Sequence, residues 1–140
     1  MITHLSVYSC SCLSHLISLF LFHTFSNIRI TRSLCAVKLS LNDCDFAGPL
    51  PTELGYLWNM TRLQMKNNAF TGTIPQQYGR LEELEQFTIE GNKLTGEVPL
   101  EVCDLLKEKL DQFVVDCYNR RSGIGFECEP QCCTLCRDVS

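Results

Sequence analysis

The stretch "FTGTIP" at residues 70–75 decides the fold, because it returns at a fixed interval. The chain reads "FAGPLP" at 46–51 and "LTGEVP" at 94–99, so the three copies are equally spaced. A phrase repeated at one period is typical of a repeating architecture and not of a single active-site loop.

The same period holds column by column. Four of the columns are Leu39/Leu63/Phe87, Leu41/Met65/Ile89, Gly48/Gly72/Gly96 and Pro51/Pro75/Pro99. The apolar columns exchange only apolar residue types, apart from Tyr78 in the column of Leu54 and Val102. A period in the range of roughly 20–29 residues with this spacing predicts a solenoid of leucine-rich repeats.

Each repeat shows a strand followed by a turn. In "LQMKN" (63–67) apolar and polar residues alternate, which is the pattern of a half-buried strand. We therefore expect strands near 37–41, 62–66, 86–90 and 111–115. Asn68 follows the strand, where its amide can both donate and accept hydrogen bonds to buried backbone groups. Gly72 permits positive φ, and Pro75 fixes φ before the chain returns along the back of the coil.

These residues resemble the plant-type leucine-rich repeat, LxxLxLxxNxLxGxIPxxLGxL. The segments "LQMKNNAFTGTIPQQYGRL" and "FTIEGNKLTGEVPLEVCDL" match it closely, and "LSLNDCDFAGPLPTELGYL" matches with Cys44 in place of Asn. The resemblance covers roughly residues 36–116. It implies an α/β solenoid: a right-handed coil with a short parallel concave sheet, acting as a secreted or membrane-attached module that recognises proteins.

The tail "DCYNRRSGIGFECEPQCCTLC" (116–136) looks like the cysteine cap of short leucine-rich-repeat proteins of diatom-like algae. Together these features divide the chain into a leader (1–26), repeats (27–116) and a cysteine-rich cap (117–140). The sequence departs from the plant pattern in that no amino-terminal cysteine cap precedes the first repeat.

The leader has three possible interpretations. The apolar run "LISLFLF" (16–22) is too short to span a bilayer and suits the apolar region of a signal peptide, although a basic segment before it is missing. Alternatively, the stretch is upstream sequence that is not a true start, or a signal anchor. We expect a location outside the cell or on the extracellular face of a membrane, with attachment through a larger parent protein as one option.

Ten cysteines in 140 residues point to an oxidising compartment. Six of them form an even set that we expect to pair as three disulfides: Cys103, Cys117, Cys128, Cys132, Cys133 and Cys136. The alternative is a zinc site made by Cys128, Cys132, Cys133 and Cys136. Cys44 is expected to be a buried free thiol, because an extended strand would hold it more than ~10 Å from Cys35. Cys35 is then left over, which suggests that the chain is incomplete at its start.

Side chains at the outward strand positions form what we call the concave face. Its predicted binding residues are Lys38, Ser40, Asn42, Arg62, Gln64, Lys66, Gln86, Thr88 and Glu90. The last repeat continues the columns with Gln112, Val114 and Asp116, in a register left open by two extra residues in 101–110. This face is either an ordinary solvated surface or a patch for an unidentified protein or peptide. Three to four strands offer less than the ~800 Å² per partner of a standard interface, so binding should be weak.

Other functions find little support. The net charge of −4 gives no basic surface for nucleic acid. All three histidines lie in the leader, and no catalytic set or phosphate-binding loop appears, so we expect no enzyme activity and no cofactor. "NMT" (59–61) makes Asn59 an N-glycosylation site if the chain is secreted. The alternative to a recognition module is a structural extracellular solenoid, or a fragment of a larger receptor-like protein with no ligand of its own.

Overall fold

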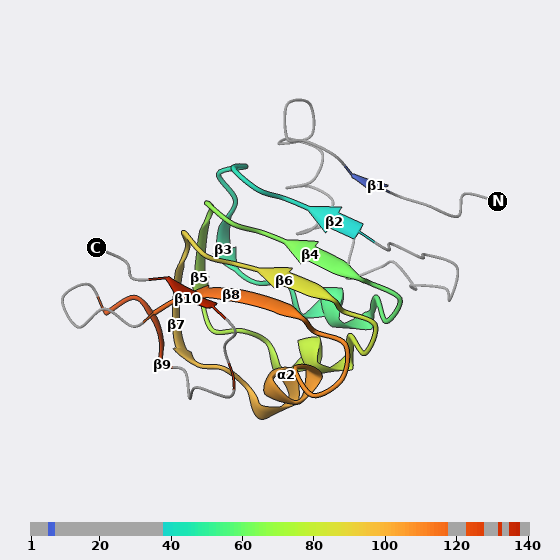
Figure 1. The fold of residues 1–140 in the computed structure, drawn as a ribbon. Coiled ribbons are helices and arrows are strands. Elements are labelled where there is room, and N and C mark those ends of the chain that lie inside the picture. Colours follow the sequence, from blue (N-terminus) through green and yellow to red (C-terminus); the bar gives the residue numbers. More distant parts are fainter. Residues whose placement is uncertain (1–5, 8–37, 118–122, 128–131, 133–134, 138–140) are drawn as a thin grey trace.

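Each coil of the chain contributes one short strand to a first, entirely parallel sheet (Figure 1). The structure, a computed structural model, describes residues 6–7, 38–117, 123–127, 132 and 135–137. Within them the strand order is β1 (Ser6–Val7), β2 (Lys38–Ser40), β4 (Arg62–Gln64), β6 (Gln86–Thr88), β8 (Gln112–Asp116) and β10 (Leu135–Arg137). The four strands expected in the repeats are confirmed, and the fold class is the predicted one.

The register follows the repeat. Lys38 pairs with Arg62 and Arg62 with Gln86, so each residue lies beside its equivalent in the next repeat. Gln86 pairs with Gln112, which places the two extra residues of the last repeat in the connection and not in the sheet. Parallel strands need a crossover between them, and the remainder of each coil provides it.

A second parallel sheet runs beside the first, and sequence reasoning did not predict it. It contains β3 (Ala47–Pro49), β5 (Ala69–Gly72), β7 (Lys93–Glu97) and β9 (Gly125–Glu127). The segment that begins "FTG" is therefore partly a strand and not only a turn. Gly72 in this segment has φ 81°, in the left-handed region that glycine adopts at little cost, so its predicted role holds.

Short helical turns form the back of the coils. They are the 3₁₀ turns η3 (Thr52–Tyr56) and η4 (Gln76–Arg80) and the helix α2 (Leu100–Leu105). Pro75 precedes η4 with φ −66°, as expected for a proline that starts a helical turn. Gly79 allows η4 and α2 to pack closely, because a Cβ atom there would overlap the backbone of Glu101. None of the helices in the described ranges has the length and apolar character needed to cross a bilayer.

The inward strand positions stack into continuous apolar columns. Phe87 stacks on Phe113 with ring centroids 5.1 Å apart, and Tyr78 meets Phe87 edge-on at 5.8 Å. Tyr78 is fully buried, and its hydroxyl donates a hydrogen bond of 2.9 Å to the carbonyl oxygen of Pro51 in the previous coil. Burial, aided by the charge of Glu53, raises the pKa of Tyr78 above its usual range, so the hydroxyl remains a donor. Tyr78 thus joins two coils through both packing and a hydrogen bond.

Asn68 links neighbouring coils through its side-chain amide. Its Oδ1 accepts hydrogen bonds from the backbone N–H groups of Cys44 (3.1 Å) and Phe46 (3.0 Å) in the previous coil. Its Nδ2 donates to the carbonyl oxygens of Leu41 (2.7 Å) and Met65 (3.1 Å). The predicted role of Asn68 in satisfying backbone groups at the turn is confirmed.

Asn92 repeats this arrangement one coil later. Its Oδ1 accepts from the N–H of Phe70 (3.1 Å), and its Nδ2 donates to Met65 (2.9 Å) and Ile89 (2.8 Å). Asn68 and Asn92 together form what we call the asparagine ladder. It satisfies backbone groups where each strand ends and the chain turns toward the second sheet.

We predict that Asn68→Ala lowers the free energy of unfolding by about 1–3 kcal/mol, because backbone groups of two coils lose their partners. Urea or guanidinium titration measures the change in midpoint. Lys93→Ala, at an exposed position of β7, is the control and should leave the midpoint nearly unchanged. Equal midpoints for Asn68→Ala and the wild type would contradict the role given to the asparagine ladder.

Candidate functional site

The register of the first sheet places the predicted concave-face residues in columns. Lys38, Arg62, Gln86 and Gln112 are successive partners in the first column, and Ser40, Gln64, Thr88 and Val114 are successive partners in the second. The third column, Asn42, Lys66, Glu90 and Asp116, follows the second by two positions along the chain. Backbone bonds continue the pairing there, from Asp43 N to Lys66 O (3.1 Å) and from Asn67 N to Glu90 O (2.9 Å).

The two ends of this face differ in exposure. Lys38 and Arg62 are exposed, and Gln64, Lys66 and Gln86 are half-buried. Thr88 and Glu90 are only 6% and 7% exposed, so the expectation that these two outward positions are open to solvent is corrected. Their column neighbours in β8, Val114 and Asp116, are buried as well. Alternation along a strand identifies the face on which a side chain lies, but not whether that face is covered.

A row of amides crosses the middle of the concave face. Gln64 Nε2 donates to Gln86 Oε1 (3.2 Å), and Gln86 Nε2 donates to Gln112 Oε1 (2.6 Å). The three side chains come from β4, β6 and β8, so each bond spans neighbouring strands. This glutamine row fixes the orientation of its members and presents a polar surface.

Two of the predicted binding residues also serve the fold. Asn42 Oδ1 accepts a hydrogen bond from the backbone N–H of Lys66 (3.0 Å), and its Nδ2 donates to Ser40 Oγ (3.2 Å). Replacing Asn42 would therefore disturb the turn between β2 and β3 as well as the surface. Lys38 and Arg62 carry no such duty.

Lys38 and Arg62 place two positive charges side by side on β2 and β4. The ion pairs in the described part of the chain are Lys107–Asp104 (2.7 Å) and Lys109–Glu83 (2.6 Å), so neither concave-face cation belongs to one. Like charges directly opposite each other on neighbouring strands are unfavourable. An anionic group of a partner would relieve that repulsion.

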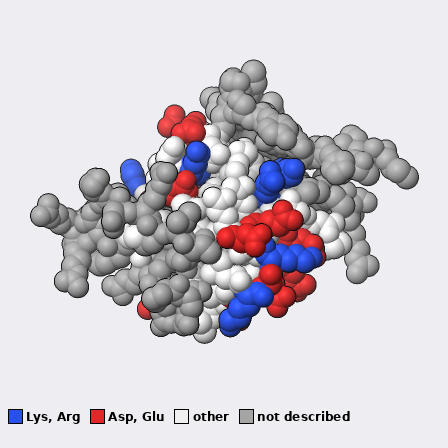
Figure 2. Space-filling model, viewed as in Figure 1, with Lys and Arg blue, Asp and Glu red and all other residues white. Residues whose placement is uncertain are grey.

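Charges of both signs are interspersed over the described surface in the view of Figure 2, and neither sign dominates. The two ion pairs are at exposed positions and contribute little to stability. The hydrogen bond to Asp104 raises the pKa of Lys107, with the charge of Asp104 adding to the effect.

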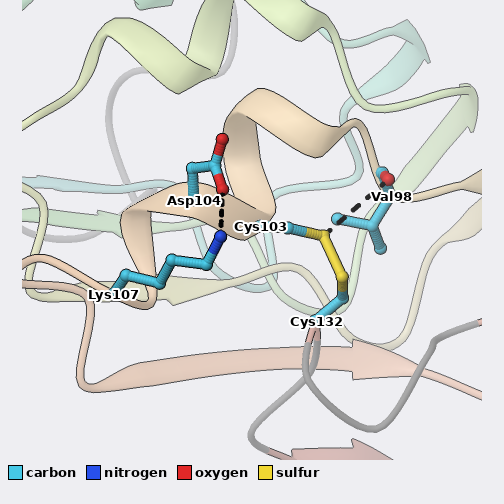
Figure 3. The surroundings of a disulfide bond; sticks show 5 residues. All are labelled: Val98, Cys103, Asp104, Lys107 and Cys132. Carbon is cyan, nitrogen blue, oxygen red and sulfur yellow. Dashed lines mark hydrogen bonds and ion pairs between the residues drawn. A yellow bond between two sulfur atoms is a disulfide. The ribbon is translucent and has the colours of Figure 1, made fainter.

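A disulfide joins Cys103 in α2 to Cys132 in the tail (Figure 3). The Cα atoms are 4.8 Å apart, and both residues are buried. The Cys103 sulfur lies 4.0 Å from the carbonyl oxygen of Val98. That approach is a contact only, because a disulfide sulfur has no proton to donate. The bond ties the tail, which supplies β10 to the first sheet, to the back of the last coil.

Cys117 is also disulfide-bonded. Cys128 and Cys133 lie outside the described residues, as does the side chain of Cys136, so the remaining pairings stay a prediction. The zinc alternative loses one of its ligands, since Cys132 is bonded to Cys103. Among the described residues, no group of three or more metal-binding side chains comes together.

The expectation that Cys44 is a free thiol is wrong, because Cys44 is disulfide-bonded. The distance estimate assumed an extended chain up to Cys44. Instead the chain turns at this point, where Asp43 and Asp45 have φ of 56° and 55°. Rise per residue along a strand therefore does not measure how far Cys44 lies from other cysteines. Of the leader (1–26) the structure describes only Ser6 and Val7, which form β1 beside β2. The rest of the leader and Cys35, which carried the related expectations, lie outside the described residues.

Asn59 and the nearby aromatic residues lie between η3 and β4. Asn59 is half-buried in a turn, which fits a glycosylation site without testing it. Tyr56 and Trp58 are 50% and 54% exposed, and the guanidinium of Arg80 lies 5.2 Å from the centre of the Tyr56 ring. Sequence reasoning did not single out these two aromatic residues. The repeat could have shown that they are unusual, because the equivalent positions one repeat later hold the charged residues Arg80 and Glu82.

Solved structures similar to this chain include plant receptor ectodomains and a receptor kinase. The BIR2 ectodomain from Arabidopsis thaliana is 28% identical, with a TM-score of 0.54 over 58% of this chain and 42% of that one. The ectodomain of the receptor kinase GASSHO1/SCHENGEN3 from the same plant, in complex with CASPARIAN STRIP INTEGRITY FACTOR 2, is 23% identical. Its TM-score is 0.53 over 56% of this chain and 9% of that one.

A third similar structure, Pollen Receptor Kinase 3, is 24% identical, with a TM-score of 0.51 over 75% of this chain and 42% of that one. At such identities the last two show likeness of fold. This chain spans less than half of the length of each of these structures. Neither the scan of protein-family models nor the search of curated proteins finds a match.

We predict that Cys103→Ala combined with Cys132→Ala lowers the free energy of unfolding by about 2–4 kcal/mol, because the unfolded chain loses a cross-link. Limited proteolysis should then cleave the tail while residues 38–105 remain protected. Lys107→Ala, at an exposed position of the same region, is the control. A tail equally resistant with and without the bond would sink the prediction.

Proposed function

We propose that this chain, a leucine-rich-repeat protein of the plant type, is a receptor-like module that binds a protein or peptide on its concave face. The observation that carries the proposal is the pair Lys38 and Arg62, exposed on neighbouring strands and outside the ion pairs of the described part of the chain. Beside it, the glutamine row offers hydrogen-bonding groups at fixed positions. The outward positions of the sheet thus carry polar side chains that the packing of the apolar core does not require.

Support also comes from the comparisons. The BIR2 ectodomain is a receptor ectodomain of the same fold, and the GASSHO1/SCHENGEN3 ectodomain was crystallised with a partner. We carry over from them only the class of function: a non-enzymatic module on the extracellular side of a membrane, or secreted. Attachment to a membrane would come through a larger parent protein. The partner remains a protein or peptide of unknown identity.

We predict that selection of a displayed library of random peptides on the wild-type protein enriches binders, and that Arg62→Glu weakens those binders by about tenfold or more, or ~1.4 kcal/mol. The physical reason is that arginine side chains at an interface often carry a large share of the binding energy. Lys93→Glu makes the same charge change on the exposed side of β7 and serves as the control.

The outcomes distinguish a recognition module from a structural solenoid. Enrichment that Arg62→Glu reduces and Lys93→Glu does not supports recognition at the concave face. If the wild type enriches no more peptide than the unfolded protein does, the structural solenoid with no ligand of its own is the better description. Equal losses in the two variants would place binding outside the concave face.

We further propose that the chain passes through the secretory pathway and is glycosylated at Asn59. Expression with its leader in plant cells should give secreted protein whose mass falls on digestion with an N-glycosidase. Asn59→Gln should abolish that mass shift and leave secretion intact. Intracellular retention of the wild type, or a mass unchanged by digestion, would contradict this proposal.

A further inference from the structure

The side chain of Glu90 has an oxygen atom that is buried and makes no hydrogen bond. The side chain is 7% exposed, and the unpartnered atom is Oε2. Within the part of the chain that the structure describes, no other buried side-chain nitrogen or oxygen lacks a partner. Buried polar groups in folded proteins are nearly always satisfied, so a single exception needs an explanation.

The position of Glu90 is fixed by the sheet. It follows β6 by two positions, and its carbonyl oxygen accepts a hydrogen bond of 2.9 Å from Asn67 N. Thr88, on the same face, accepts at its carbonyl oxygen from Met65 N at 2.8 Å. Hydrogen bonds to the β4 coil therefore fix the backbone at Thr88 and Glu90. The unsatisfied Oε2 atom does not result from a loosely held loop.

The neighbouring charges do not serve Glu90. Lys66 is in the same column on the β4 side, yet the ion pairs among the described residues do not include it. Asp116, on the β8 side, uses its Oδ2 to accept hydrogen bonds from the backbone N–H groups of Gly91 (2.8 Å) and Asn92 (3.3 Å). Asp116 thus stabilises the fold through its hydrogen bonds, whereas the Oε2 atom of Glu90 makes none.

We propose that Glu90 binds a cationic side chain, an arginine or lysine, of the peptide that occupies the concave face. The inference rests on the proposed function and names the ligand chemistry at one position of that site. A carboxylate turns readily about its terminal bond, so the oxygen that is buried in the free protein can be presented to an arriving donor. Hydrogen bonds between a carboxylate and a guanidinium or ammonium are among the strong ones in proteins.

The charge of Glu90 itself favours a cation over other ligands. A neutral donor would satisfy the oxygen but leave the charge of the carboxylate uncompensated. An anion would be repelled. Lys38 and Arg62 lie toward the opposite end of the same face, so a bound peptide would place its cationic residue near Glu90 and an acidic group near Lys38 and Arg62.

A purely structural role for Glu90 makes a different prediction. If Glu90 supports the fold, Glu90→Gln should lower the melting temperature of the free protein. If the carboxylate is kept for a ligand, Glu90→Gln should leave that temperature unchanged or raise it, because a buried unpaired charge is removed. Glu97→Gln, at an exposed position in β7, is the matched control.

The deciding experiment is a nuclear magnetic resonance titration of the full chain with N-acetyl-arginine amide. N-acetyl-citrulline amide, its neutral analogue, is the control ligand. We expect the arginine compound to shift the resonances of Thr88, Glu90 and Asp116, and the citrulline compound to do so at least about tenfold more weakly. Glu90→Gln should remove the preference for arginine, and Glu97→Gln should keep it.

The inference is overturned if arginine amide does not bind the wild type, if citrulline amide binds as well, or if Glu90→Gln binds arginine amide unchanged. A lowered melting temperature of Glu90→Gln also counts against it. The peptide library tests the proposed function separately. The library is selected on the wild type and on Glu90→Gln, and the arginine and lysine content of the enriched peptides is compared. If the enriched peptides need Arg62 but contain no more arginine or lysine on the wild type than on Glu90→Gln, the proposed function stands and this inference fails.

Discussion

The asparagine ladder is the interaction on which the rest of the structure depends. A chain that turns at the end of every strand leaves buried N–H and carbonyl groups that the sheets cannot satisfy. One amide per coil meets both needs, because it carries a donor and an acceptor. Asn68 and Asn92 do so for successive coils, and each reaches back to the coil before it. The hydrogen bonds that join neighbouring coils are thus the same bonds that satisfy their buried backbone groups.

This arrangement makes the molecule nearly one-dimensional, because each coil contacts mainly its neighbours. The apolar end of the last coil must then be covered by another segment. The tail supplies β9 to the second sheet and β10 to the first, so it continues both stacks at once. The disulfide between Cys103 and Cys132 holds that tail against the back of the coil.

The period of the sequence was enough to predict four strands of the first sheet, the register of the first three of them and the role of Asn68, because those features recur in successive coils. It did not predict β1 and β10, which lie outside the repeats. The second sheet escaped prediction because its strands are weak alone. β3 consists of Ala47, Gly48 and Pro49, residues that disfavour strands, and pairing with β5 creates it. The disulfide of Cys44 escaped because a turn replaced the assumed extended chain. Among the candidate site residues, the column of each could be predicted, but the burial of Thr88 and Glu90 could not, since it depends on what lies over the sheet.

The contrast between Asp116 and Glu90 shows how a repeat protein can separate folding from function on one surface. Both are carboxylates in one column, and both are buried. Asp116 accepts hydrogen bonds from the previous coil, as the ladder residues do. Glu90 has a longer side chain, and its Oε2 has no such bond. Because the backbone at this point is already held by the sheet and by Asn92, the fold does not require a carboxylate at position 90. A charge that folding does not need, retained in a buried place on the proposed binding face, is what a recognition residue would require.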